Sequence, residues 1–144
     1  MYFIGAFVVL SGVLLASFLK GIPIALFLNV PVITVILFAI AGFLISTSNS
    51  KTFAHGVKAV ISSKYNFDDA ERESAAGLFK ILSKVVIFAS LIALMFGLIS
   101  VLYGINDAET VGFRLTTAII APISGLAISL AFFEPAAYVL KKEK

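Results

Sequence analysis

The sequence predicts an all-α integral membrane protein, and two observations lead to this fold class. The chain has 144 residues, of which 60% are hydrophobic and only 13% are charged, and its mean hydropathy is +1.09. A soluble domain of this size has too much surface for its volume to bury so many apolar side chains. The hydrophobic residues also gather into four long runs without Lys, Arg, Asp or Glu at their centres, at about 2–19, 22–46, 85–106 and 111–140.

Each run is long enough to cross a membrane, because a helix of about 20 residues spans the hydrocarbon core of about 30 Å. We therefore predict a single transmembrane domain, 1–144, with four transmembrane helices and short cytoplasmic helices between spans 2 and 3. The expected spans are 2–19, 30–46, 85–106 and 112–140, and the cytoplasmic helical segment is 47–84. The first run lacks a basic stretch before it and leads directly into the second, which indicates a retained span and not a cleaved signal peptide.

The second run is interrupted in its first third by Pro23, Asn29 and Pro31. Proline is best tolerated in the first turn of a helix, so the second span is expected to begin near Pro31. Residues 21–29 are then a short outer turn or an interfacial segment.

The distribution of Lys and Arg predicts the orientation of the chain. Six basic residues lie in 47–84 and three at the C-terminus, whereas the other connections carry only Lys20 and Arg114. Because cytoplasmic segments are enriched in Lys and Arg, both termini and the central segment are expected in the cytoplasm.

The central segment is expected to form two helices. The first has an amphipathic spacing of apolar residues, carried by Phe53, Val57, Val60 and Ile61. Asn66 or Asp68 is a candidate N-cap for the second, which can run through Lys84 into the third span without a break.

Several function classes are excluded or disfavoured by composition. The chain has no cysteine and one histidine, so we expect no disulfide, no metal site and no cofactor. No catalytic residues are predicted, and the protein is not expected to be an enzyme. The net charge of +3 comes from basic residues that border the spans, so nucleic acid is not an expected partner.

Small residues follow one face of each of the last two spans. In lipid, close packing through such residues drives helix association. One interpretation is packing within a single bundle, and the other is a lining shared between several chains. The third span has Ser90, Ala93, Gly97, Ser100 and Gly104, and the fourth has Thr117, Ala121, Gly125 and Ser129.

Glu134 is the exception to the uncharged interior, and Pro135 follows it directly. An ionisable residue inside a membrane segment is a functional candidate. The structural alternative is that Glu134 reaches the cytoplasmic interface or pairs with Lys80 or Lys84. Pro135 removes a helix hydrogen bond and is expected to kink the span at this depth. No span has a carboxylate near its middle, so ion coupling would need an acid from another chain or from Glu134.

Two stretches resemble the MotA/TolQ/ExbB proton-channel family. The end of the second span and its entry into the cytoplasm, residues 41–60, read AGFLISTSNSKTFAHGVKAV. The last helical hairpin, residues 97–140, reads GLISVLYGINDAETVGFRLTTAIIAPISGLAISLAFFEPAAYVL. The resemblance is to a minimal MotA-like motor (stator) subunit with a shortened cytoplasmic region.

The resemblance implies a homo-pentamer around a dimer of a MotB/ExbD-like partner with a single span. That partner carries the Asp that binds the transported H+ or Na+, and the complex lies in the cytoplasmic (inner) membrane of a prokaryote. Glu134 and Pro135 are then candidates for coupling and for the helix distortion. The candidate ion-path and pore-lining residues are Ser90, Ala93, Gly97, Ser100, Thr117, Ala121, Ser124 and Gly125.

The chain departs from the family pattern in three places. It reads Val85-Val86-Ile87 where the family has a proline, it has Pro122 where a pore-facing hydroxyl is expected, and its cytoplasmic region is short. The last departure favours a minimal motor or energiser over a flagellar stator. Two alternatives remain open, a small four-helix transporter and a structural membrane scaffold. Small multidrug-type transporters use a glutamate in the first span, which has no acid here.

Overall fold

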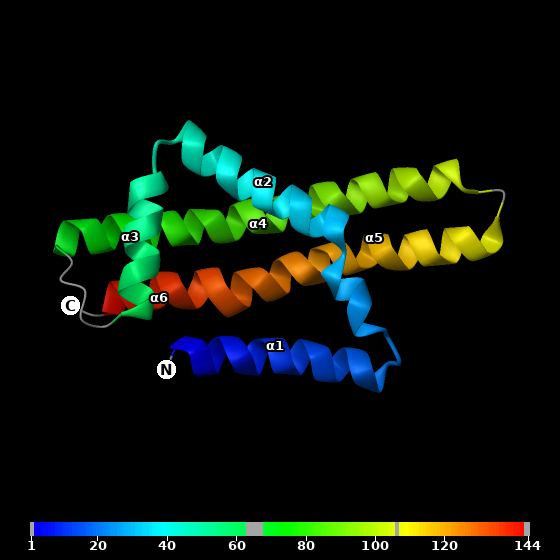
Figure 1. The fold of residues 1–144 in the computed structure, drawn as a ribbon, viewed down its shortest axis with the longest axis horizontal. Coiled ribbons are helices and arrows are strands. Elements are labelled where there is room, and N and C mark those ends of the chain that lie inside the picture. The colour runs from blue at the N-terminus through cyan, green and yellow to red at the C-terminus, as the bar shows by residue number, and fades with distance from the viewer. Residues whose placement is uncertain (1, 63–67, 106, 143–144) are drawn as a thin grey trace.

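The computed structural model describes residues 2–62, 68–105 and 107–142, and every regular element in these ranges is helical (Figure 1). The elements are α1 (Tyr2–Leu19), the 3₁₀ helix η1 (Ile24–Leu28), α2 (Val30–Ser46), α3 (Ser50–Ile61), α4 (Asp69–Tyr103), α5 (Ala108–Ile128), the π-helical turn η2 (Ser129–Phe133) and α6 (Glu134–Lys142).

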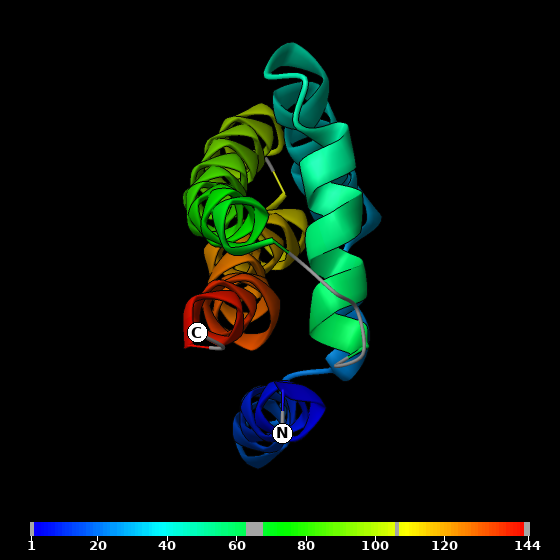
Figure 2. The same cartoon turned by 90° about the vertical axis from the view of Figure 1, so that its left-hand side faces the viewer.

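The helices form two layers. One layer holds α1, α4 and the rod that α5, η2 and α6 form together. The second layer holds α2 and α3 and lies on one side of the first (Figure 2). The rod runs antiparallel to α4, and α2 crosses α4 obliquely (Figure 1). Both ends of the chain lie at the end of the molecule that α3 lies across. A hydrogen bond of 2.8 Å from the Tyr2 hydroxyl to the Phe132 carbonyl joins α1 to η2.

Three helical stretches are long and apolar enough to cross a membrane: Ile24–Ser46, Asp69–Tyr103 and Ala108–Lys141. The all-helical membrane architecture is therefore confirmed. The stretch Ile4–Leu19 is a shorter apolar helix, and the fourth span and the orientation of the termini stay predictions.

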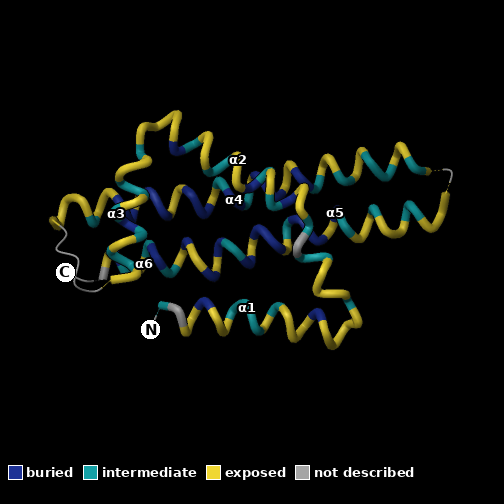
Figure 3. Tube along the Cα trace, viewed as in Figure 1, coloured by how far each residue is buried: buried dark blue, intermediate teal, exposed yellow. Residues whose placement is uncertain are grey.

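Large apolar side chains cover much of the outer surface. Phe7, Phe38 and Phe88, for example, are 71%, 75% and 65% exposed. Buried residues follow the lines where α4 meets α2, α5 and α6, and exposed residues cover the outward faces (Figure 3). Contiguous exposed apolar surface of this kind is unfavourable in water and marks contact with lipid or with other membrane helices.

The second span begins where the prolines predict. Pro31 lies in the first turn of α2, which starts at Val30, and η1 occupies most of the predicted outer segment 21–29. Gly21 has a φ of +67°, a conformation that glycine adopts without the strain caused by a Cβ atom. The turn between α1 and η1 therefore depends on glycine at this position.

Helix α4 runs without a break from the predicted cytoplasmic segment into the third predicted span. It has 35 residues, which at 1.5 Å per residue is about 50 Å and exceeds the hydrocarbon core. Asp68 occupies the N-cap position without a side-chain cap hydrogen bond, and the alternative cap Asn66 lies outside the described residues.

The amphipathic helix α3 packs on α4 with its predicted apolar face. Phe53 stacks on Phe79 with ring centroids 5.6 Å apart, and a Cβ atom on Gly56 would lie 2.6 Å from Phe79 Cε2. Ile61, the last member of the predicted apolar face, is exposed because it is the final residue of the helix. Figure 1 shows that α3 runs across the long axis of α4.

The small residues of α4 and α5 bring the two helix backbones close together. A Cβ atom on Gly97 would overlap the Cβ of Ala118 and lie 2.9 Å from its Cα. A Cβ atom on Gly125 would overlap Ser90 and lie 3.3 Å from the Val86 carbonyl. These contacts form within one chain, as the bundle-packing interpretation of the small-residue faces expects.

The sequence predicts a kink at Pro135, and the structure has a π-helical turn directly before it. The Glu134 N–H donates to the carbonyl of Ser129, five residues earlier, in place of the α-helical partner four residues earlier. Proline has no N–H, and its ring clashes with the carbonyl of residue i−4, here Ala131. The wider turn before Pro135 gives this ring room without breaking the rod.

Asp107 caps the N-terminus of α5 on the connection between α4 and α5. Its side chain accepts hydrogen bonds from the Thr110 hydroxyl and from the Glu109 backbone N–H. The Thr110 bond above all holds the pKa of Asp107 below its ordinary value of 3.8. This cap fixes the start of α5 opposite the end of α4.

The close contact at Gly125 can be tested by adding a methyl group. Gly125→Ala places a methyl group into Ser90, and overpacking of this kind costs about 1–3 kcal/mol. Gly112→Ala is the matched control on the same helix, because a Cβ atom there meets nothing within 4 Å. It is expected to stabilise the helix by up to about 1 kcal/mol. Free energies of reversible unfolding in mixed micelles check both values, and equal effects would contradict the packing.

Candidate functional site

A polar cluster lies where α4 meets η2 and α6. The Ser83 hydroxyl donates to Glu134 Oε1 at 2.7 Å, and Ser83 Oγ lies 2.7 Å from Ser129 Oγ. Ser83 and Ser129 are only 1% and 2% exposed, whereas Glu134 is exposed. The cluster therefore joins α4, η2 and α6 at one point.

The direction of both hydrogen bonds follows from the number of protons. A serine hydroxyl has one proton to donate. The proton of Ser83 is directed at Glu134, so Ser129 is the donor in its bond with Ser83. The result is an ordered chain from Ser129 to Ser83 to Glu134, in which both buried hydroxyls are satisfied, as burial requires.

The π-helical turn brings Glu134 into this cluster. In an α-helix, a residue five positions later lies about 140° around the axis, so Glu134 would point away from Ser129. The bond from the Glu134 N–H to the Ser129 carbonyl places Glu134 directly over Ser129 instead. Ser83 lies on the facing side of α4, seven residues or about two turns before Ser90.

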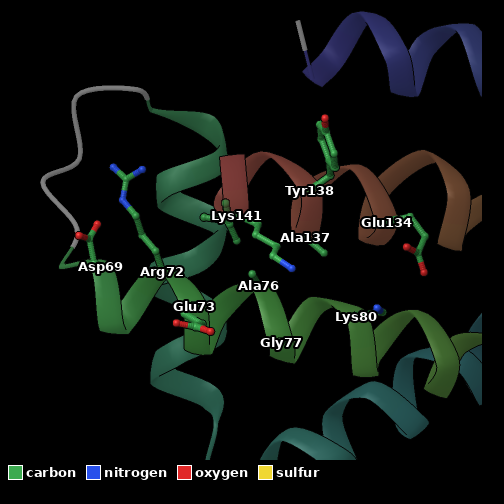
Figure 4. A pocket seen from close by; sticks show the side chains of 11 residues that line it. Asp69, Arg72, Glu73, Ala76, Gly77, Lys80, Glu134, Ala137, Tyr138 and Lys141 are labelled. Atoms are coloured by element: carbon green, nitrogen blue, oxygen red, sulfur yellow. The ribbon is translucent and has the colours of Figure 1, made fainter. Parts of the chain in front are cut away.

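Glu134 also borders an open groove between the first half of α4 and α6. The groove has a volume of about 480 Å³ and carries charged residues of both signs. Glu134 and Lys80 lie at one end of it, and Asp69 and Arg72 at the other (Figure 4). The carboxylate therefore has one side against buried hydroxyls and the other toward a polar, open space.

The sequence left two structural roles for Glu134, snorkelling or an ion pair with Lys80 or Lys84. Among the described side chains, the hydrogen bond to Glu134 comes from Ser83, and neither lysine forms an ion pair with it. Lys80 shares the groove with Glu134 without contacting it directly. The position at the groove is consistent with a carboxylate that reaches a polar boundary.

Four of the predicted pore-lining residues border a second groove, of about 250 Å³, between α2, α4 and α5. They are Ala93, Gly97, Ser100 and Thr117. Arg114 also lines this groove and donates from Nη1 to the Ser100 carbonyl at 2.7 Å. This groove lies within a single chain.

The other four predicted residues, Ser90, Ala121, Ser124 and Gly125, are buried within the chain. The Ser90 hydroxyl donates to the carbonyl of Ile87 on its own helix at 2.7 Å. Ser124 Oγ is buried without a hydrogen-bond partner in the described part of the chain. The pore-lining role of all eight residues stays a prediction.

Sequence reasoning identified Glu134 but did not select Ser83 and Ser129 for the site. The helical spacing of small residues could have indicated both serines, because each lies one or two turns from a small residue on the same helix face. Ser129 follows Gly125 by four residues, and Ser83 precedes Ser90 by seven. The spacing does not show that the two serines contact each other, because this contact depends on how α4 and η2 are aligned.

Comparison with known proteins gives no match, since no family model, curated protein or solved structure is similar to this chain. In the described residues, no group of three His, Asp or Glu side chains lies close enough to hold a metal ion. The geometry of the chain itself therefore carries the functional argument.

The hydroxyl chain can be measured by a double-mutant cycle of Ser83→Ala and Ser129→Ala. Because the two side chains share a buried hydrogen bond, we expect a coupling energy of about 0.5–2 kcal/mol in reversible unfolding. The matched control replaces Ser129→Ala with Ser74→Ala, an exposed serine on the same helix as Ser83. That control pair should be additive within about 0.5 kcal/mol. Additivity of Ser83 and Ser129 would contradict the bond.

Proposed function

We propose that this chain is a MotA-like subunit of an ion-driven rotary membrane motor. In this proposal it forms a pentameric ring around a dimer of a single-span partner, and the partner's Asp binds the transported H+ or Na+. The chain catalyses no reaction and needs no cofactor. It has four spans in the cytoplasmic membrane of a prokaryote, with both termini in the cytoplasm.

The observation that carries the proposal is the hairpin of α4 and α5. Its helices pack through glycine, alanine and serine, and between Lys84 and Glu134 the only carboxylates are Asp107 and Glu109 at the outer connection. An ion that crosses the membrane beside this hairpin needs a titratable group near the middle. A helix from another chain is the source that fits an uncharged hairpin.

The arrangement of the ends supports the proposed topology. Both termini lie at the end that α3 crosses, and α3 runs transverse to α4 (Figure 1). A transverse amphipathic helix suits the membrane interface, where its apolar face is covered and its polar face meets water. Lys51 and Lys58 of α3 are exposed, which fits the cytoplasmic side by the distribution of positive charge.

The outer face of the hairpin supports assembly with further helices. Many of its large apolar residues are exposed and lie on the membrane part of α4 and α5. This surface can contact lipid, neighbouring subunits and a central partner helix. The group on α4 includes Leu91, Ile92, Met95, Phe96 and Ile99, and the group on α5 includes Ile119, Ile123 and Leu126.

Stoichiometry tests the proposal directly. The complex is purified from its native membrane in mild detergent and its mass is measured by native mass spectrometry. We expect five copies of this chain with two copies of a smaller protein that has one apolar segment containing an Asp. A stable monomer would contradict the proposal, and a dimer without a partner would favour a small transporter.

Pro135→Ala tests whether the π-helical turn serves the motor. The substitution restores an N–H and removes the clash with the Ala131 carbonyl, so the turn is expected to relax to α-helical geometry. Assembly should persist in native mass spectrometry, and ion uptake by vesicles that contain the chain and its partner should be lost. Pro23→Ala, in the outer turn, is the control and should retain uptake. Loss of the pentameric assembly in Pro135→Ala would mean that the proline serves helix packing and has no separate role in ion transport.

A further inference from the structure

We propose that Glu134 is a proton-binding group of this chain, and that Ser83 and Ser129 form a hydrogen-bonded relay that reverses when Glu134 takes up a proton. This site goes beyond the proposed motor, which places its ion-binding acid on the partner. It depends only on contacts within one chain.

The two sides of the Glu134 carboxyl have different surroundings. On one side Oε1 accepts a hydrogen bond from Ser83, a side chain that is 1% exposed. On the other side the residue borders the open groove of about 480 Å³. A proton can reach the carboxylate from water in the groove, and the buried hydroxyls respond to the change of charge.

Proton uptake reverses the chain of donors. In the ionised state, Ser129 donates to Ser83 and Ser83 donates to Glu134. A protonated carboxyl has an O–H of its own and can donate it to Ser83. The Ser83 proton then turns toward Ser129, and the Ser129 proton toward the carbonyl of Gly125, four residues earlier on its own rod. One proton is added to the carboxylate, and each hydroxyl keeps one.

The distances favour a proton over a metal cation. Both links in the cluster are 2.7 Å between oxygens, which is the separation of an O–H···O hydrogen bond. Two oxygens that coordinate one cation have the ion between them and lie farther apart. The ammonium group of Lys80, at the same end of the groove, also opposes a second fixed cation (Figure 4).

Other titratable groups lie on the elements that pack against η2 and α6. They include Asp69, Glu71, Arg72, Glu73, Lys80 and Lys84 on α4, Lys51, His55 and Lys58 on α3, Tyr2 on α1, Glu109 and Arg114 on α5, and Tyr138 and Lys141 on α6. His55, on α3, is the histidine among them. A test must therefore read protonation at Glu134 itself and include a His55→Asn variant.

The protonation of Glu134 can be measured with dicyclohexylcarbodiimide, which reacts with protonated carboxyls. The full chain is placed in lipid nanodiscs, treated with the reagent at a series of pH values, and digested for mass spectrometry. We expect labelling at Glu134 that falls as the pH rises and that is the same in sodium chloride and in choline chloride at equal ionic strength. Glu134→Gln should remove this label, and His55→Asn should leave its pH profile unchanged.

Two matched comparisons separate the relay from an ordinary carboxylate. Glu73 borders the same groove and no hydrogen bond joins it to Ser83 among the described residues, so its labelling should not change in Ser83→Ala. Ser83→Ala removes the donor to the ionised carboxylate, so labelling of Glu134 at a given pH should rise up to about tenfold. Ser74→Ala, at an exposed position of the same helix, should leave it unchanged.

Three results would overturn the inference. Protection of Glu134 by sodium would mean a metal cation site, and an equal rise in the labelling of Glu134 and Glu73 in Ser83→Ala would mean a general change in access to the groove. A pH profile that is the same in Ser83→Ala and in the unchanged chain would exclude the relay. If Ser83→Ala fails to fold, the pH and sodium dependence of Glu134 labelling in the unchanged chain still decides between a proton site and a metal cation site. None of these results changes the subunit count, so failure here is distinct from failure of the motor proposal.

Discussion

The close contact between α4 and α5 is the constraint on which the rest of the structure depends. In lipid, helices gain little by burying apolar surface against one another, so backbones must approach closely to hold a hairpin together. Gly97 against Ala118 and Gly125 against Ser90 provide this approach at two levels of the membrane. The contact fixes the alignment of α4 with the rod of α5, η2 and α6, and α1, α2 and α3 then pack around that pair.

The alignment has a chemical consequence at the end of the hairpin where α6 begins. The π-helical turn directly before Pro135 rotates Glu134 toward Ser83. A feature of backbone geometry thus creates a hydrogen-bonded carboxyl at the edge of a groove. The same turn receives the Tyr2 hydroxyl at the Phe132 carbonyl, so α1 is tied to the point where the rod changes its helical form.

The proposed motor and the proposed proton site make different demands on the chain. The motor needs a hairpin without charge at its centre beside a foreign acid, and between Lys84 and Glu134 the charged residues are Asp107, Glu109 and Arg114, all near the connection of α4 and α5. The proton site needs an acid of its own with a buried side and an open side, and Glu134 has both. The two proposed sites lie at different depths of one hairpin.

The sequence by itself determined the helices, because the information for each lies within one continuous segment. The charge-free runs, Pro31 and the unbroken pattern through Lys84 predicted α2 and α4 closely, and the charge of Glu134 identified it at once. Only the tertiary structure decided that the small residues pack within the chain and that Ser83 and Ser129 meet Glu134. These outcomes depend on the alignment of two helices far apart in sequence and on a π-helical turn that breaks the regular period of 3.6 residues.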